Sequence, residues 1–180
     1  MIGVDEVGRG AWAGPLLVCA VRLNKHVAGL ADSKLLSAKK RQELAVIISS
    51  AADIGYGWVP ALEIDARGLA AALRIATERA LQQINPIPHE EIIIDGTINF
   101  APSYNVTTMI KADQIIPAVS AASIVAKVMR DKQMHILSVQ YPAYGFDTHV
   151  GYGTKQHAQA IETNGFCDEH RKSFKIRQFS

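Results

Sequence analysis

The sequence predicts a single α/β domain built around a mostly buried central sheet. Short apolar runs with strand character alternate along the chain with longer segments in which apolar residues recur at helical spacing. No change of composition and no internal repeat divides the 180 residues. A chain of this length suits one domain with a substantial core. Interleaved strands and helices are typical of a sheet covered by helices.

Five segments have the character of strands, and we expect them to form the sheet. They are residues 2–6, 15–23, 54–59, 92–94 and 106–110. The run from Leu16 to Val21 is apolar at every position and too short for a buried helix. The third segment ends at Pro60, which has no backbone N–H to donate. The fourth is a β-branched triplet of isoleucines that stops at Asp95-Gly96.

Four segments are expected to be helices, at about 37–51, 68–84, 117–139 and 154–163. Ser37 and Thr154 are residue types that cap helix N-termini, and Pro117 is of a type favoured in the first turn. In the long third helix, the expected core face consists of Ala121, Val125, Val128, Lys132 and Ile136. A second face carries Ser120, Ser123, Lys127 and Asp131, for which we favour a role in structural support.

Composition narrows the class of protein. No apolar stretch reaches the roughly 20 residues that a membrane span needs, so no membrane partner is expected. The net charge of +2 is compatible with a nucleic-acid partner without being diagnostic of one. Cys19 and Cys167 form neither a CxxC pair nor a disulfide framework, which favours a reduced, cytoplasmic setting. Asp5 lies so close to Met1 that we expect no signal peptide ahead of it.

Acidic residues stand at or beside the ends of three expected strands. Asp5 and Glu6 interrupt the first, Asp95 ends the fourth and Asp113 follows the fifth. Any one of them could be a turn residue or a helix cap. Functional groups gather at strand ends in open α/β sheets, however, and four carboxylates could converge there. Carboxylates without a His or Cys cluster match magnesium or manganese better than zinc. With Arg9 available to bind phosphate, these acids suggest a nuclease.

Gly8-Arg9-Gly10 directly follows the acid pair, and its glycines permit close approach of the backbone to a ligand. The stretch from Gly8 to Ala13 also fits the G-x-G-x-x-A dinucleotide fingerprint, with Asp32 as a possible ribose acid, so an NAD-dependent oxidoreductase is one alternative. That motif must open a helix, whereas Gly14-Pro15 leads into a strand. A binding module without catalysis is a second alternative, and it leaves the four acids unexplained.

The chain resembles ribonuclease HII in motifs that follow the family's order over nearly the whole length. These motifs are Gly3 to Gly10, Asp32-Ser33-Lys34, Ile94-Asp95-Gly96, Lys111-Ala112-Asp113, Ser120 to Ile124 with Ala126-Lys127-Val128 and Arg130-Asp131, Tyr144-Gly145-Phe146, Gly151 to Thr154, and His170 to Phe174. The resemblance implies the ribonuclease H-like fold, a five-stranded mixed sheet flanked by helices. It implies one catalytic domain over residues 1–180, with a basic C-terminal segment from about residue 165.

The resemblance maps the family's four catalytic, metal-binding acids onto Asp5, Glu6, Asp95 and Asp113. It implies a divalent cofactor, Mg²⁺ or Mn²⁺, with two ions during catalysis. The implied activity is endonucleolytic cleavage of the RNA strand of RNA/DNA hybrids, including nicking 5′ of a single ribonucleotide embedded in duplex DNA. Products would carry 5′-phosphate and 3′-hydroxyl ends. RNA/DNA hybrids and ribonucleotide-containing DNA duplexes are therefore the expected partners, and the expected oligomeric state is a monomer.

Substrate-binding roles are also implied by the resemblance. Gly8, Arg9, Gly10 and Tyr152 match residues that in the family read the ribose 2′-hydroxyl at the RNA–DNA junction. Lys34 is expected to contact phosphate. The basic residues Arg171, Lys172, Lys175 and Arg177 of the C-terminal segment are expected to contact duplex phosphates.

Ribonuclease HIII is the nearest competitor within the nucleases. It typically carries an extra N-terminal domain and lacks the Gly-Arg-Gly motif. The chain also departs from the ribonuclease HII pattern. Trp12 stands where the family usually has a smaller aliphatic residue, and a bulky ring there could alter how the junction docks. The chain also stops soon after Ser173-Phe174. For this reason we expect it to bind substrate more weakly than other members of the family and to catalyse the same reaction.

Overall fold

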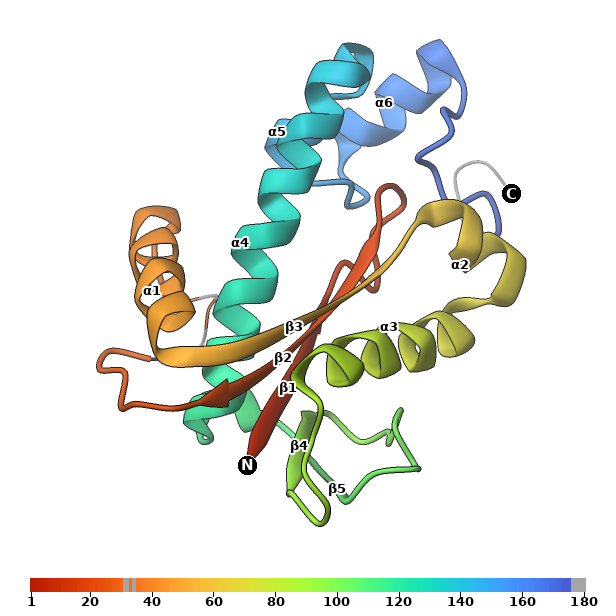
Figure 1. The fold of residues 1–180 in the computed structure, drawn as a ribbon. Helices are drawn as coiled ribbons and strands as arrows, with labels where there is room; N and C mark the ends of the chain where they lie inside the picture. The colour runs from red at the N-terminus through yellow and green to blue at the C-terminus, as the bar shows by residue number, and fades with distance from the viewer. Residues whose placement is uncertain (31–32, 34, 176–180) are drawn as a thin grey trace.

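The computed structural model describes residues 1–30, 33 and 35–175, and it contains a five-stranded mixed sheet flanked by helices (Figure 1). The strands are β1 (Ile2–Val7), β2 (Leu16–Leu23), β3 (Ala52–Val59), β4 (Ile92–Asp95) and β5 (Val106–Met109). Their order across the sheet is β3-β2-β1-β4-β5. The first three are antiparallel, whereas β4 runs parallel to β1 and β5 runs parallel to β4. The expected mixed sheet is confirmed.

The α-helices are α1 (Ala38–Ala51), α2 (Ala61–Arg67), α3 (Leu69–Ile84), α4 (Pro117–Gln140), α5 (Phe146–His149) and α6 (Lys155–Asn164). Two short 3₁₀ turns are η1 (Ala112–Gln114) and η2 (Pro142–Tyr144). The expected helices correspond to α1, α3, α4 and α6, and the Ser37 and Thr154 side chains cap α1 and α6 as predicted. The short helices α2 and α5 were not predicted. None of the helices within the described ranges is long and apolar enough to cross a membrane.

Helices cover both faces of the sheet (Figure 1). Because side chains alternate along a strand, β2 supplies two separate cores. Leu16, Val18 and Ala20 pack in a core that α3 completes. Leu17, Cys19 and Val21 pack in a second core with residues of α1 and α4. This two-sided burial explains why the β2 sequence is continuously apolar.

The contact between β1 and α4 is unusually close, and Gly3 makes it possible. A Cβ atom at Gly3 would lie 2.2 Å from the backbone nitrogen of Val119 and from the carbonyl carbon of Ala118. No larger residue fits at this crossing without moving α4. The glycine therefore brings the first turns of α4 against the strand that carries Asp5.

The predicted core face of α4 is only half correct. Ala121 and Val125 are buried, but Lys132 and Ile136 are exposed. In the C-terminal half of α4 the buried positions are instead Arg130, Met134 and Leu137. The helical spacing of apolar residues misplaced this face, because Arg130 takes a buried position where backbone carbonyl oxygens satisfy its guanidinium.

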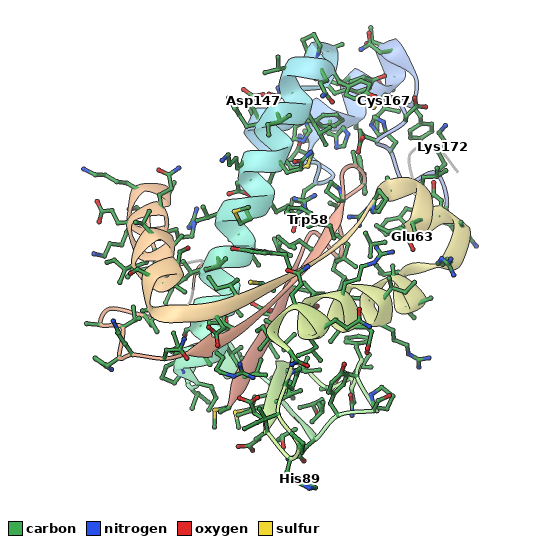
Figure 2. All side chains as sticks on the ribbon, in the orientation of Figure 1. Trp58, Glu63, His89, Asp147, Cys167 and Lys172 are labelled. Atoms are coloured by element: carbon green, nitrogen blue, oxygen red, sulfur yellow. The ribbon has the colours of Figure 1, made fainter. Side chains whose placement is uncertain are left out.

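The C-terminal segment returns to the body of the protein after α6, passing α2 (Figure 1). Figure 2 shows Cys167 and Lys172 on this segment. Asp65 of α2 fixes it by accepting hydrogen bonds from the backbone N–H groups of Lys172 and Ser173, at 2.8 and 3.0 Å, and from the Ser173 hydroxyl. The unpredicted α2 thus anchors the C-terminal segment.

Candidate active site

The strand register brings Asp5 and Asp95 together. Val4 of β1 pairs with Ile94 of the parallel strand β4, so the next residues, Asp5 and Asp95, stand side by side at the C-terminal ends of these strands. Both line a cleft of about 350 Å³, and Glu6 lines it as well. Three of the four predicted acids therefore line one cavity beside the C-terminal ends of β1 and β4.

Asp5 lines the cleft and is held in place by local hydrogen bonds. Its Oδ1 accepts the backbone N–H of Glu6 at 2.8 Å, and its carboxyl group is hydrogen-bonded to the Ser123 side chain of α4. Burial, together with the negative charges of Glu6 and Asp95, raises the pKa of Asp5 to about 7 against the opposing effect of the Ser123 hydrogen bond. The site thus concentrates negative charge that a bound cation would neutralise.

Glu6 is paired with Arg9 across one turn of backbone. The Arg9 Nη1 atom lies 3.3 Å from Glu6 Oε1. Burial raises the pKa of Glu6, Arg9 counteracts that effect, and Asp95 adds to it. The Gly-Arg-Gly motif is therefore electrostatically connected to the acids even though its arginine is largely exposed.

Asp95 contacts the start of η1, and Asp113 lies within it. Asp95 Oδ1 accepts the backbone N–H of Ala112 at 2.8 Å. Asp113, inside η1, is buried and does not belong to the described lining of the cleft. The Ser120 hydroxyl donates to the Asp113 backbone carbonyl, which agrees with the predicted supporting role of that serine. Asp113 is therefore not among the acids that line the cleft in this structure.

The donor chemistry of the cleft fits a hard divalent cation, since its acidic groups are carboxylates. Across residues 1–30, 33 and 35–175, however, no three Asp, Glu, His or Cys side chains are arranged so that they could hold one metal ion. The contacts of the acids account for this. Glu6 is turned toward Arg9, and one oxygen each of Asp5 and Asp95 accepts a backbone N–H. A cation would have to draw Glu6 away from Arg9.

Gly8, Arg9, Gly10 and Tyr152 line the same cleft as the acids, although Tyr152 is more than a hundred residues away in the chain. The Tyr152 hydroxyl accepts the Gly8 backbone N–H at 3.3 Å. The Trp12 ring lies against the segment that follows Tyr152, since a Cβ atom at Gly153 would be 2.2 Å from the indole ring. The junction-reading residues implied by the resemblance are thus brought together, and Trp12 packs against the segment that carries Tyr152. Lys34 lies outside the described residues.

Two buried arginines, Arg130 and Arg171, bond backbone carbonyl groups of the segments that line the cleft. Arg130 donates to the carbonyl oxygens of Ala13, Pro15 and Val150 at 2.8 to 3.2 Å. Its guanidinium also lies over the Tyr152 ring, 5.4 Å from the centroid. Burial lowers the pKa of Arg130. This single side chain connects the end of the β1–β2 loop that leads into β2 with the segment that carries Val150 and Tyr152.

The prediction for Arg171 is wrong. We expected it to contact duplex phosphates, but its side chain is fully buried and donates to the carbonyl oxygens of Arg9 and Gly14. Burial and the nearby charge of Arg130 lower the pKa of Arg171 to about 10. A run of basic residues near a chain end suggested a solvent-facing tail, and only the fold shows that this arginine points inward. Arg177 lies outside the described residues.

Sequence reasoning also missed Arg41, which lines the cleft from the first turn of α1. Its Nη1 atom donates to the carbonyl oxygens of Ser33 and Leu36, at 2.8 and 2.5 Å. No motif pointed to this arginine, because a helix surface commonly carries basic residues. Ser123 and Lys127 of α4 complete the wall, and Ser123 bonds the Ser33 hydroxyl at 2.9 Å.

Comparison with known proteins decides which family these features represent. Residues 2–177 match the family model described as Ribonuclease HII. The chain belongs to the ribonuclease HII family. This match favours ribonuclease HII over ribonuclease HIII, and it confirms the resemblance seen in the sequence motifs.

Named relatives agree with the family. Ribonuclease HII of Campylobacter concisus is 46% identical over 175 residues, covering 97% of this chain and 92% of the relative. The solved ribonuclease HII of Archaeoglobus fulgidus, in its complex with PCNA, has a TM-score of 0.80 at 25% identity and covers 95% of this chain and 91% of that one. Ribonuclease H2 of Pyrococcus horikoshii has a TM-score of 0.78 at 26% identity, covering 97% and 93%.

Family membership supports a ribonuclease H type hydrolase, an endonuclease acting on RNA/DNA hybrids, with dependence on a divalent metal. The dinucleotide-binding alternative is rejected by the fold. The loop after Gly8 leads directly into β2, the antiparallel neighbour of β1, with no helix to present its N-terminus to a pyrophosphate.

Proposed function

We propose that this ribonuclease HII cleaves the RNA strand of RNA/DNA hybrids and nicks duplex DNA on the 5′ side of a single embedded ribonucleotide, leaving 5′-phosphate and 3′-hydroxyl ends. One observation carries the proposal. The acids Asp5, Glu6 and Asp95 share a single cleft with Gly8-Arg9-Gly10 and Tyr152. A phosphodiester placed at the acids would lie next to groups able to examine the sugar.

Asp5, Glu6 and Asp95 are the residues that would hold Mg²⁺ or Mn²⁺. Two such ions, when bound, supply an activated water and stabilise the leaving oxygen of an in-line displacement. The protein's own contribution is the placement of the carboxylates. Asp5 is fixed by the Glu6 backbone and Ser123, and Asp95 by the Ala112 backbone. Asp113 would complete the set from its position in η1, in line with its place in the motif.

Substrate selection needs a second device, because the acids place no restriction on which sugar precedes the cut. The 2′-hydroxyl is the group that distinguishes RNA from DNA at one position. Backbone groups of Gly8 and Gly10 can approach the sugar closely, since glycine has no Cβ. The Tyr152 ring can pack on the following deoxyribose. Arg9 and Lys34 would bind flanking phosphates, Arg9 after releasing Glu6.

We place the enzyme in the cytoplasm as a monomer, with its catalytic machinery in one domain. Support comes from the use of its cysteines, since Cys19 is buried and both cysteines are free thiols. Lys172 and Lys175 stay available to duplex phosphates, because both are exposed on the C-terminal segment.

The test is cleavage of a DNA duplex that contains one ribonucleotide, with Mg²⁺, Mn²⁺ or a chelator present. We expect a single nick 5′ of the ribonucleotide with either metal, and the fragment downstream should carry a 5′-phosphate that supports ligation. An all-DNA duplex of the same sequence is the control and should remain intact. Absence of cleavage with both metals would reject the proposed function.

A further inference from the structure

Three buried histidines lie behind Tyr152, and the proposed function gives them no role. His149, His157 and His170 are 7%, 0% and 1% exposed. They come from α5, α6 and the C-terminal segment, so separate parts of the chain meet at this point. The rings of His149 and His157 stack with centroids 4.4 Å apart, and the ring of His170 lies 5.2 Å from that of His157.

Hydrogen bonds join two of these rings in a chain that begins at Tyr152. His157 Nδ1 lies 3.0 Å from the Tyr152 carbonyl oxygen, and His157 Nε2 lies 3.1 Å from His170 Nε2. At the other end, His170 Nδ1 is reached by the Cys167 backbone N–H at 2.9 Å and by the Cys167 sulfur at 3.1 Å. Every ring nitrogen of the pair therefore has a partner.

The partners fix where the protons lie. A carbonyl oxygen only accepts, so His157 Nδ1 must carry the proton and donate to Tyr152. Burial lowers the pKa of His157 to about 4 and that of His170 to about 4, so both rings are neutral at pH 7. His157 Nε2 then accepts from His170 Nε2–H, which leaves His170 Nδ1 to accept from Cys167. One tautomer of each ring satisfies all of these bonds.

The rest of the surroundings hold the His157 ring in place. Its backbone N–H donates to the Thr154 hydroxyl, the cap of α6, at 3.2 Å. The ring stands edge-on to Phe146, with centroids 5.6 Å apart, and lies 5.5 Å from the Trp12 ring. His157 has little freedom to turn away from the Tyr152 carbonyl. That carbonyl belongs to the peptide directly after the tyrosine whose hydroxyl meets Gly8.

We propose that His157 is a positioning residue for Tyr152, and that His170 keeps its ring in the tautomer this role requires. The inference rests on the proposed reading of the RNA–DNA junction by Tyr152. By fixing the Tyr152 peptide, the His157 Nδ1–H sets the direction of the tyrosine side chain toward Gly8. Loss of this bond leaves the acids untouched, so it weakens recognition of the substrate and does not alter the chemical step.

The first experiment compares two replacements of His157 on the ribonucleotide-containing duplex. His157→Phe keeps an aromatic ring but removes both nitrogens. His157→Asn keeps an amide nitrogen close to the Nδ1 position and can still donate to Tyr152. We expect His157→Phe to raise KM by about tenfold, the size of one well-formed hydrogen bond, with kcat unchanged, and we expect His157→Asn to restore KM to within about threefold.

Tyr144→Phe is the matched control for disturbance of the aromatic cluster. Tyr144 stacks on Phe146 and its hydroxyl donates to the Gly165 carbonyl at 3.0 Å, away from Tyr152. This variant should lose stability without a change in KM. If His157→Phe does not fold, His157→Gln takes its place, because a glutamine amide reaches the Nε2 position and not Nδ1. Equal KM values for His157→Asn and the Phe or Gln variant would overturn the proposal.

A double-mutant cycle shows whether His157 acts through Tyr152. In the Tyr152→Ala background, His157→Phe should produce no further rise in KM, since the ring it positions is gone. A rise as large as in the wild-type background would overturn the proposal. The two proposals remain separable. A wild-type enzyme that cuts nothing rejects the proposed function, whereas a cutting enzyme with unchanged KM in His157→Phe rejects the role of His157 alone.

Discussion

The guanidinium carbon of Arg130 lies 5.4 Å from the centre of the Tyr152 ring, so a buried cation on α4 stands directly behind the residue proposed to meet the substrate. The same guanidinium is bonded to three backbone carbonyl groups. One helix position therefore determines the shape of two loops that are far apart in sequence.

Arg130→Lys should destabilise the protein by about 2–4 kcal/mol, because an ammonium group cannot reach three carbonyls in the directions that a planar guanidinium can. Chemical denaturation measures the change in the free energy of unfolding. Arg74→Lys, at an exposed position of α3, is the control and should change it by less than about 0.5 kcal/mol. Equal stability of the two variants would contradict the bracing role of Arg130.

Gly8→Ala should lower stability by about 1–3 kcal/mol. Gly8 has a φ of +84°, and an added Cβ would lie 2.2 Å from Arg130 Nε. Gly10→Ala is a matched control in the same motif, because nothing lies within 4 Å of a Cβ added there. Thermal unfolding of both variants checks the difference. A Gly8→Ala protein as stable as Gly10→Ala would show that the loop does not require this geometry.

Asp5→Asn should stabilise the metal-free protein at pH 8. The pKa of Asp5 is raised from 3.8 to about 7 in the folded state, so its contribution to stability is full below pH 3.8 and is lost as the pH rises through 7. Asparagine cannot ionise, and it keeps the oxygen that accepts the Glu6 N–H. We expect a gain of about 2 kcal/mol at pH 8, reduced from the full shift by solvent in the cleft.

Unfolding of Asp5→Asn and wild type in the presence of a chelator, at pH 8 and pH 4, measures this gain. The difference should disappear at pH 4, where wild-type Asp5 is protonated. Addition of Mg²⁺ should stabilise wild type more than the variant at pH 8. A variant that is less stable than wild type at pH 8 in chelator would mean that Asp5 is not under electrostatic strain.

Acid should weaken the fold through the buried histidines. The pKa values of His157 and His170 are lowered from 6.5 to about 4, so their contribution to stability is full above pH 6.5 and is lost as the pH falls toward 4. Each histidine should account for about 2–3 kcal/mol over this window.

The free energy of unfolding, measured between pH 8 and pH 4, should therefore fall less steeply for His157→Asn than for wild type. His26→Gln changes an exposed histidine and should keep the wild-type slope. Titratable groups that all the variants share contribute equally to the pH dependence of the free energy of unfolding, so their contributions cancel in this comparison. Parallel curves for His157→Asn and wild type would contradict the burial of a neutral ring at this position.

Much of this architecture can be predicted from the sequence, because the spacing of the apolar residues and the residues that end each segment agree with the fold. The apolar run of β2 and the isoleucine triplet of β4 end within two residues of their predicted limits. Asp5 and Asp95 converge because β1 and β4 are parallel neighbours, a pairing that periodicity alone cannot give. Gly8 and Tyr152 meet only through the tertiary fold, and the resemblance to the family supplied that link.

Other features are not readable from the sequence for physical reasons. The helix α2 spans seven residues after Pro60, too few to show a helical repeat. Arg130 and Arg171 occupy buried positions because backbone carbonyls bond them, and no sequence pattern records where carbonyl oxygens point. Asp113 follows a strand in the sequence, but its position in η1 leaves it buried.

We propose that the acids of this cleft cut next to a ribonucleotide that the adjoining loop reads. The most direct measurement is the rate at which wild type and Asp95→Asn nick a duplex with one ribonucleotide in Mg²⁺ or Mn²⁺. We predict a single metal-dependent nick 5′ of the ribonucleotide by wild type, and a loss of at least about 10²-fold in Asp95→Asn, because an amide is a poor ligand for a hard cation. An Asp95→Asn protein as active as wild type would contradict the account.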